Sequence, residues 1–204
     1  MEPQFYKGNR DAFMEKLEPG SLALFFSGSP VRKTADEDYG YFANRNFVYL
    51  TGMEQKDTIL MMEKDASGYR ETLFILPPNL IEERWTGSRM KPEEIEAVSM
   101  ISSFAYKETF EEELKKVLTS GRIQKVYLDI DRMEGQVVVS AADSMEAFLK
   151  QEYPSMPIEN SLPIMKMLRL IKKPCEIRAM EKAQEITKAG ILAMMTHSKA
   201  GMYE

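Results

Sequence analysis

A single cysteine, Cys175, occurs in the 204 residues, so the chain cannot form an internal disulfide. That usage is typical of a reducing compartment. The first four residues lack the basic and apolar parts of a secretory signal peptide, and no apolar run approaches the roughly 18–20 residues of a membrane span. We therefore expect a cytoplasmic protein without a membrane partner.

Histidine is equally scarce. The only one, His197, lies near the end of a predicted helix, where the helix dipole favours an exposed imidazolium. One histidine cannot supply a His-based metal site, and nothing places it in a Ser-His-Asp or Cys-His arrangement. Phosphate-binding glycine motifs are also missing. Runs of carboxylates at residues 36–38 and 111–113 are typical of solvated faces. The sequence predicts no catalytic and no metal-binding residue in this chain.

Basic residues are neither abundant nor clustered. There are 27 Lys and Arg against 32 Asp and Glu, which gives a net charge of −5. Binding to nucleic acid needs clustered positive charge that neutralises phosphates, so the sequence predicts no nucleic-acid partner. The 44% of hydrophobic and 29% of charged residues are instead typical of a folded globular protein.

Apolar patterns alternate between strand-like and helix-like segments along the chain. Residues 58–76 predict a β-hairpin with a turn at 66–68, and Pro77 and Pro78 end it. Further strands are predicted at residues 22–26, 47–51 and 125–130. Helices are predicted to begin near Asn9, Pro92, Thr109, Ser140 and Pro174. This alternation predicts an α/β fold with a mixed sheet flanked by helices.

Two segments stand out from this pattern. Residues 39–52 are dense in aromatic side chains, and we interpret them as a core strand with the loop before it. Residues 85–89 hold the only tryptophan, Trp85, followed by Gly87 and Arg89. A lone tryptophan in such a place is either a half-buried anchor or part of a presented binding loop. The residues themselves leave both interpretations open.

Taken in order, three segments resemble the N-terminal domain of Xaa-Pro aminopeptidase (aminopeptidase P) and prolidase. This is the creatinase-type N-terminal domain of the pita-bread metallopeptidase family. The first segment joins residues 32–36 to residues 39–52, and the second is 85–89. The third, residues 169–177, resembles the start of the catalytic domain. Positions that match the family pattern are Asn44, Phe47, Tyr49, Thr51, Gly52, Trp85, Gly87 and Arg89.

The chain also departs from that pattern. Gly40 stands where the family often has proline, and Phe42 where some members have arginine. These differences fall in the loop before residues 47–51, and they remove any contact there that needs arginine.

The resemblance implies a mixed sheet with a ribonuclease H-like outline. It implies that residues 1–160 form the N-terminal domain, and that residues 161–204 form a linker and the first helix of a truncated pita-bread catalytic domain. Two divalent metal ions, as a rule manganese, would lie in the missing catalytic domain. The full-length enzyme would hydrolyse the bond between an N-terminal residue and a following proline, and this fragment alone would be inactive.

For this chain the resemblance implies a role in assembling a homo-oligomer and in shaping the cleft for a peptide with proline second. Trp85, Asp36 and Arg89 would bind substrate in a neighbouring subunit. Three alternatives to an Xaa-Pro aminopeptidase are compatible with the sequence. The whole protein is a prolidase restricted to dipeptides, a creatinase-like hydrolase of a small amidine, or a metal-free pita-bread protein that binds peptides or histones.

Overall fold

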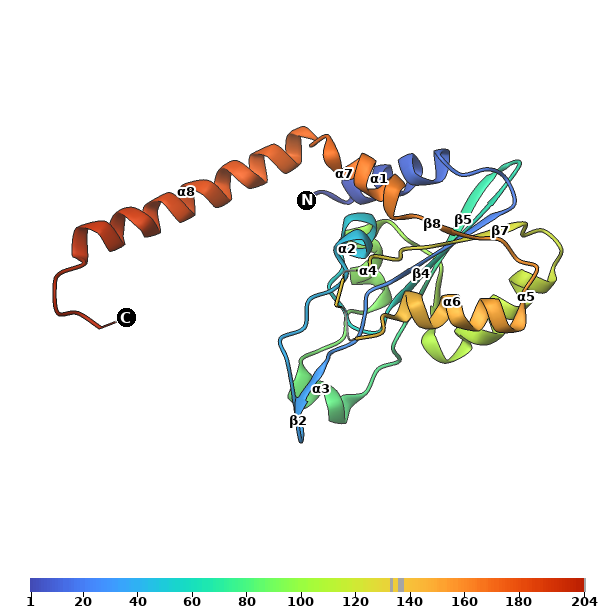
Figure 1. Cartoon of the computed structure of the whole chain (residues 1–204), viewed down its shortest axis with the longest axis horizontal. Coiled ribbons are helices and arrows are strands. Elements are labelled where there is room, and N and C mark those ends of the chain that lie inside the picture. The colour runs from blue at the N-terminus through green and yellow to red at the C-terminus, as the bar shows by residue number, and fades with distance from the viewer. Residues whose placement is uncertain (133, 136–137, 204) are drawn as a thin grey trace. The chain divides into compact units, whose positions relative to one another are not determined.

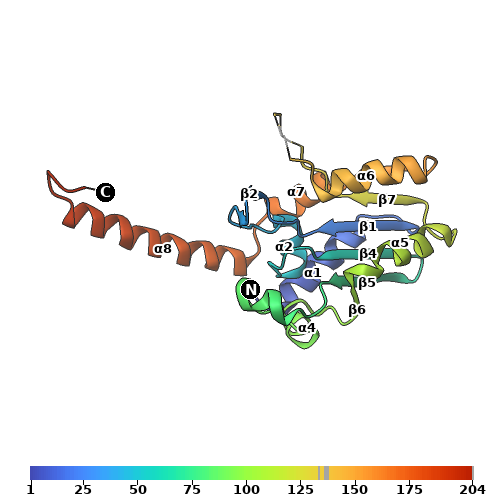
Figure 2. The same cartoon turned by 90° about the horizontal axis from the view of Figure 1, so that it is seen from below.

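A six-stranded sheet runs through the segment Glu2–Leu168 in the computed structural model, which describes residues 1–132, 134–135 and 138–203 (Figure 1). Its strand order is β6-β5-β4-β1-β7-β8. The strands are β1 (Ser21–Phe26), β4 (Ile59–Asp65), β5 (Gly68–Ile75), β6 (Phe104–Tyr106), β7 (Lys125–Leu128) and β8 (Ile158–Asn160). Figure 2 shows β7, β1, β4, β5 and β6 side by side.

The sheet is mixed. β4 pairs antiparallel with both β1 and β5, whereas β6 is parallel to β5. On the other side of β1, β7 and β8 continue the sheet in parallel. The predicted α/β class and the predicted hairpin at residues 58–76 are therefore confirmed.

Alternating side chains of β1 enter two cores. Ala23 and Phe25 belong to one core, and Leu22 and Leu24 to the other, as the two-residue repeat of a strand dictates. Figure 1 shows α1 and α7 on one side of the strands and α5 and α6 on the other. The helices are α1 (Pro3–Glu15), α2 (Arg45–Thr51), α4 (Pro92–Ser99), α5 (Phe110–Thr119), α6 (Ala141–Glu152) and α7 (Leu162–Leu170).

Residues 47–51 form a helix, α2, and not the predicted strand. The Asn44 side chain accepts hydrogen bonds from the backbone N–H groups of Asn46 and Phe47, at 2.8 and 2.9 Å, and so begins the helix. Gly52 ends it in the left-handed conformation, with φ of 75°. The aromatic and β-branched composition suggested a strand, but these two caps determine the structure.

The first helix also begins earlier than predicted. Asn9 is not its N-cap, because α1 starts at Pro3, which favours the first helical turn. Asn9 is buried and donates a hydrogen bond from Nδ2 to the Tyr49 carbonyl at 2.7 Å. The Asn9 side chain therefore links α1 to α2 and does not cap a helix.

Two short strand pairs were not predicted from the sequence. Residues 27–38, for which the sequence suggested no strand, include a two-stranded hairpin of β2 (Arg32–Thr34) and β3 (Glu37–Asp38). The edge strand β8 was not predicted either, and α7 lies in residues that the resemblance assigned to a linker and the first helix of the next domain. Each strand has three residues or fewer, which is too short to show a periodic pattern.

The segment Arg169–Glu204 forms a separate unit. Within it, α8 (Pro174–His197) confirms the predicted helix. Pro174 occupies its first turn, and the Glu176 carboxylate accepts a hydrogen bond from the Lys173 backbone N–H at 2.9 Å. No residue of α8 is buried. The assignment of residues 161–204 to a catalytic domain stays a prediction. None of the helices in the described ranges is long and apolar enough to cross a membrane.

Candidate functional site

Trp85 lies on a short helix, α3 (Leu80–Thr86), that follows the end of β5. The Asn79 side chain accepts hydrogen bonds from the N–H groups of Ile81 and Glu82, which begins the helix. No residue of α3 is buried, and the Trp85 side chain is 87% exposed. Leu80 and Ile81 are similarly exposed, so α3 presents three large apolar side chains to its surroundings.

Polar contacts fix α3 although it buries nothing. Arg89 donates hydrogen bonds to the Pro77 carbonyl and, at 2.5 Å, to the Glu82 carboxylate, and its side chain is only 15% exposed. Lys56 approaches Glu82 from another loop at 3.0 Å. The hydrogen bond from Lys56 and the charges of Lys56 and Arg89 hold the pKa of Glu82 below its ordinary value. Arg89 therefore orients the helix that carries Trp85.

Asp36 lies at the turn of the β2–β3 hairpin and is exposed. The preceding residue, Ala35, has a positive φ of 34°, as the tight turn requires. An ion pair of 2.9 Å between Lys33 and Glu37 bridges the hairpin next to Asp36. Figures 1 and 2 show the hairpin and α3 at the same end of the sheet.

A cavity of about 380 Å³ lies between these elements. Its walls are the base of the hairpin, the loop before β4 and the residues after Trp85. The lining includes Asp38, Tyr39, Tyr41, Gln55, Lys56 and Arg89. Of the three predicted site residues, Arg89 lines this cavity, whereas Trp85 and Asp36 stand on elements beside it.

Tyr41 lines the cavity and is half-buried. Its hydroxyl lies 3.0 Å from the Ser27 carbonyl and 3.2 Å from the Gln55 carbonyl, so it can donate to either. Burial raises the pKa of Tyr41, which keeps the phenol neutral. Tyr41 and Lys56 were not predicted as site residues from the sequence. They line the same cavity as Arg89 only because the fold brings distant segments together.

In the part of the chain that the structure describes, no three His, Cys, Asp or Glu side chains form a group that could hold a metal ion. His197 lies at the end of α8, with Nδ1 2.8 Å from the Ala193 carbonyl. The arrangement at α3 offers an aromatic face, an exposed carboxylate and a guanidinium. These groups can bind a peptide, but they include no nucleophile with an adjacent base.

The sequence profile of the aminopeptidase P N-terminal domain matches residues 6–127. The Xaa-Pro aminopeptidase of Escherichia coli is 28% identical over 98% of this chain and 46% of its own length, and that of Haemophilus influenzae is 24% identical over 98% and 44%. The chain thus spans about half the length of these curated relatives.

Solved structures agree with these relatives. A Bacillus anthracis structure assigned provisionally to aminopeptidase P has a TM-score of 0.94 and 30% identity over 99% of this chain and 48% of its own. Escherichia coli aminopeptidase P with the inhibitor Pro-Leu has a TM-score of 0.82 and 25% identity over 100% and 47%. With a profile match over more than half of its length, the chain belongs to the aminopeptidase P N-terminal domain family.

Proposed function

We propose that this chain is the non-catalytic N-terminal part of a cytoplasmic, metal-dependent Xaa-Pro aminopeptidase. The whole protein releases the first residue of a peptide whose second residue is proline. Support comes from the matched relatives, which are named Xaa-Pro aminopeptidases and are about twice as long as this chain. The chain alone has no peptidase activity in this proposal.

In this proposal, the two catalytic metal ions bind to a part of the whole protein outside this chain. The described residues hold no group of carboxylates, histidines or cysteines suited to a metal, so they do not fit two divalent ions. We keep manganese as the expected metal of the whole protein. The chain's own contribution is then binding and assembly.

The exposed apolar side chains of α3 are the structural observation that supports a substrate-binding role for this chain. A helix that buries nothing and is nevertheless held by Arg89, Glu82 and Lys56 is built to present its side chains. Trp85 offers a flat face on which a proline ring packs well, in the cleft of a neighbouring subunit of a homo-oligomer. Asp36 attracts the free amino terminus of the peptide from the hairpin, and Arg89 holds Trp85 in place.

A comparison of this chain with the longer natural gene product tests the proposal. Both are assayed with manganese on a tripeptide with proline second and on an Xaa-Pro dipeptide. We expect the long form alone to release the first residue of the tripeptide. Cleavage of only the dipeptide would assign the protein to prolidase. Cleavage of neither would refute the peptidase assignment and favour a creatinase-like substrate or a binding role.

A further inference from the structure

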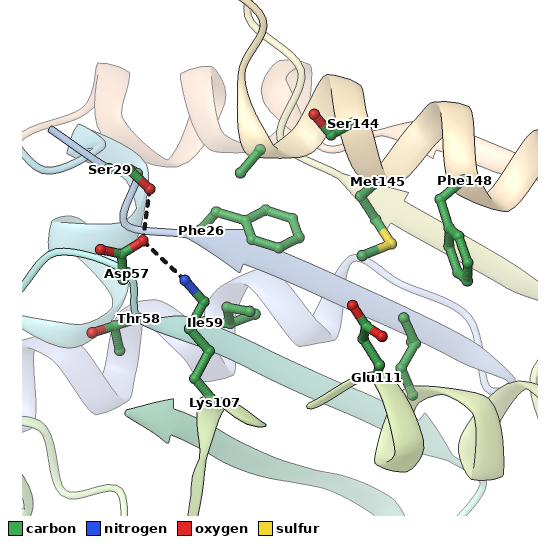
Figure 3. Close-up of a pocket in the computed structure, with 13 residues that line it drawn as sticks. Phe26, Ser29, Asp57, Thr58, Ile59, Lys107, Glu111, Ser144, Met145 and Phe148 are labelled. Atoms are coloured by element: carbon green, nitrogen blue, oxygen red, sulfur yellow. Dashed lines mark hydrogen bonds and ion pairs between the residues drawn. The ribbon is translucent and has the colours of Figure 1, made fainter. Parts of the chain in front are cut away.

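A cavity of about 470 Å³ lies on the α5 and α6 side of the sheet, where β1 ends and β4 begins (Figure 3). This volume is within the roughly 300–1,000 Å³ of small-molecule sites. Its apolar lining comes from four segments far apart in sequence: Phe26, Ile59, Leu114, Met145 and Phe148. The fold gathers these side chains at the carboxyl end of the central strand β1, where α/β sheets commonly bind ligands.

At one end of the cavity, Asp57 and Lys107 form an ion pair with no net charge. The Asp57 Oδ1 atom accepts hydrogen bonds from Lys107 Nζ at 2.9 Å and from Ser29 Oγ at 2.7 Å, as the dashed lines of Figure 3 show. Burial alone would raise the pKa of Asp57, but the hydrogen bonds from Lys107 and Ser29 outweigh it and lower the pKa. Asp57 is therefore ionised at neutral pH and offsets the charge of Lys107.

Glu111 lines the other part of the cavity from the first turn of α5. Figure 3 shows its carboxylate directed toward Met145. Within the described ranges, Glu111 forms no ion pair, in contrast to Glu112, which pairs with Lys116 at 2.7 Å. The cavity thus combines an apolar interior with the exposed carboxylate of Glu111, which pairs with no cation among the residues that the structure describes.

We propose that this cavity binds a small organic cation that joins an aromatic or branched aliphatic group to a primary ammonium. The apolar part would lie against Phe26, Met145 and Phe148, and the ammonium would bind the Glu111 carboxylate. An anionic ligand would be repelled by Glu111 and would find Lys107 engaged with Asp57. A neutral ligand would gain no charge–charge attraction from Glu111. The proposal concerns binding by this chain alone and is independent of any peptidase activity.

Phenethylamine, 3-phenylpropionate and phenylalanyl-alaninamide are suitable probes for titrations of the 204-residue chain by NMR or calorimetry. Phenethylamine should bind at least tenfold more tightly than 3-phenylpropionate, because the two share a ring and differ in the sign of the charge. The dipeptide amide identifies the natural source. Binding equal to that of phenethylamine indicates a peptide amino terminus, and much weaker binding indicates a free amine.

Three variants complete the test. Glu111→Gln should weaken phenethylamine binding about tenfold, since it removes a charge-assisted hydrogen bond. Glu112→Gln changes the neighbouring carboxylate outside the cavity and should leave the affinity unchanged. Ser144→Leu, on the exposed side of α6, should fill the cavity and abolish binding. Circular dichroism verifies that each variant is folded.

Three results would overturn the proposal: no binding of phenethylamine at millimolar concentration, an unchanged affinity in Glu111→Gln, or equal affinity for 3-phenylpropionate.

Discussion

Arg10 and Glu71 form a bidentate ion pair between α1 and β5. The Arg10 side chain is fully buried and donates from Nε at 2.7 Å and from Nη2 at 2.9 Å to the two Glu71 oxygens. Its Nη1 atom donates to the Leu50 carbonyl at 2.8 Å. The Arg10 guanidinium therefore links α1 to both α2 and β5, on the face of the sheet that α1 covers.

Loss of one partner of this pair should destabilise the domain strongly. We expect Arg10→Met to lower the free energy of unfolding by about 3–5 kcal/mol, because Glu71 keeps a largely buried charge without a partner. Urea denaturation measures the change. The double variant Arg10→Met/Glu71→Gln should recover part of the loss, since it removes the unpaired charge. A loss in the single variant below about 1 kcal/mol would show that the pair contributes little.

Gly52 offers a second test, because a side chain there would collide with Tyr6. A Cβ atom at Gly52 would lie 2.5 Å from the Tyr6 ring, and its φ of 75° is strained for any other residue. We expect Gly52→Ala to cost about 2 kcal/mol of stability or more in denaturant unfolding. Gly121→Ala is the matched control. Its φ of 72° is similar, but no atom lies within 4 Å, so only the backbone strain remains. Equal losses in both variants would contradict the steric role of Tyr6.

The lowered pKa of Asp57 predicts a loss of stability in acid. The unfolded chain binds a proton near the ordinary pKa, and the folded chain only at lower pH. The stabilisation is therefore complete above the ordinary pKa and disappears as the pH falls through the folded value. Asp57→Asn should lower the free energy of unfolding near neutral pH and have less effect near about pH 3. Urea unfolding at several pH values measures this difference.

Lys107→Met is the companion variant for Asp57. It removes the hydrogen bond that does most to lower the Asp57 pKa, together with the charge of Lys107, so it should weaken the same acid dependence. An effect of Asp57→Asn that is the same at both ends of the pH range would contradict the assignment.

Long-range geometry limits what the sequence could predict. The buried strand β1 and the β4–β5 hairpin were predictable, because Leu22, Leu24 and their neighbours form local apolar runs. Residues 47–51 were wrongly predicted as a strand, because strand and helix preferences are similar for short aromatic segments. The Asn44 and Gly52 caps contained the missing information. Buried Asn9 looked like a helix end, since only its partner on α2 explains a polar residue there.

The site was predictable only in part. The motif around Trp85 led to the family, which the profile match confirms. The support of α3 by Lys56, however, joins residues that no local pattern connects. The cavity beside Glu111 is similarly assembled from β1, α5 and α6, so no sequence window contains it. The roles of Trp85, Asp36 and Arg89 in substrate binding remain predictions.

The helix α8 should exchange its amide hydrogens rapidly in this chain. It buries no residue, and an unpacked helix has little stability of its own in water. Hydrogen exchange measured by mass spectrometry should show fast exchange for residues 174–197 and slow exchange for β1. A monomeric mass together with fast exchange indicates fraying, whereas protection in a dimer indicates that α8 packs against a second copy. Full protection in a monomer would contradict both.

Substitutions of Trp85 and of Arg89 should affect different properties. Trp85→Ala should change the stability of this chain by less than about 0.5 kcal/mol, because the side chain is exposed. In the long form, the same substitution should raise KM for a peptide with proline second, and Trp85→Phe should restore most of the affinity. Arg89→Lys should instead speed amide exchange throughout α3, because lysine cannot reproduce the contacts to both Pro77 and Glu82. If Trp85→Ala leaves KM unchanged while Arg89→Lys raises it, the guanidinium and not the indole contacts the peptide.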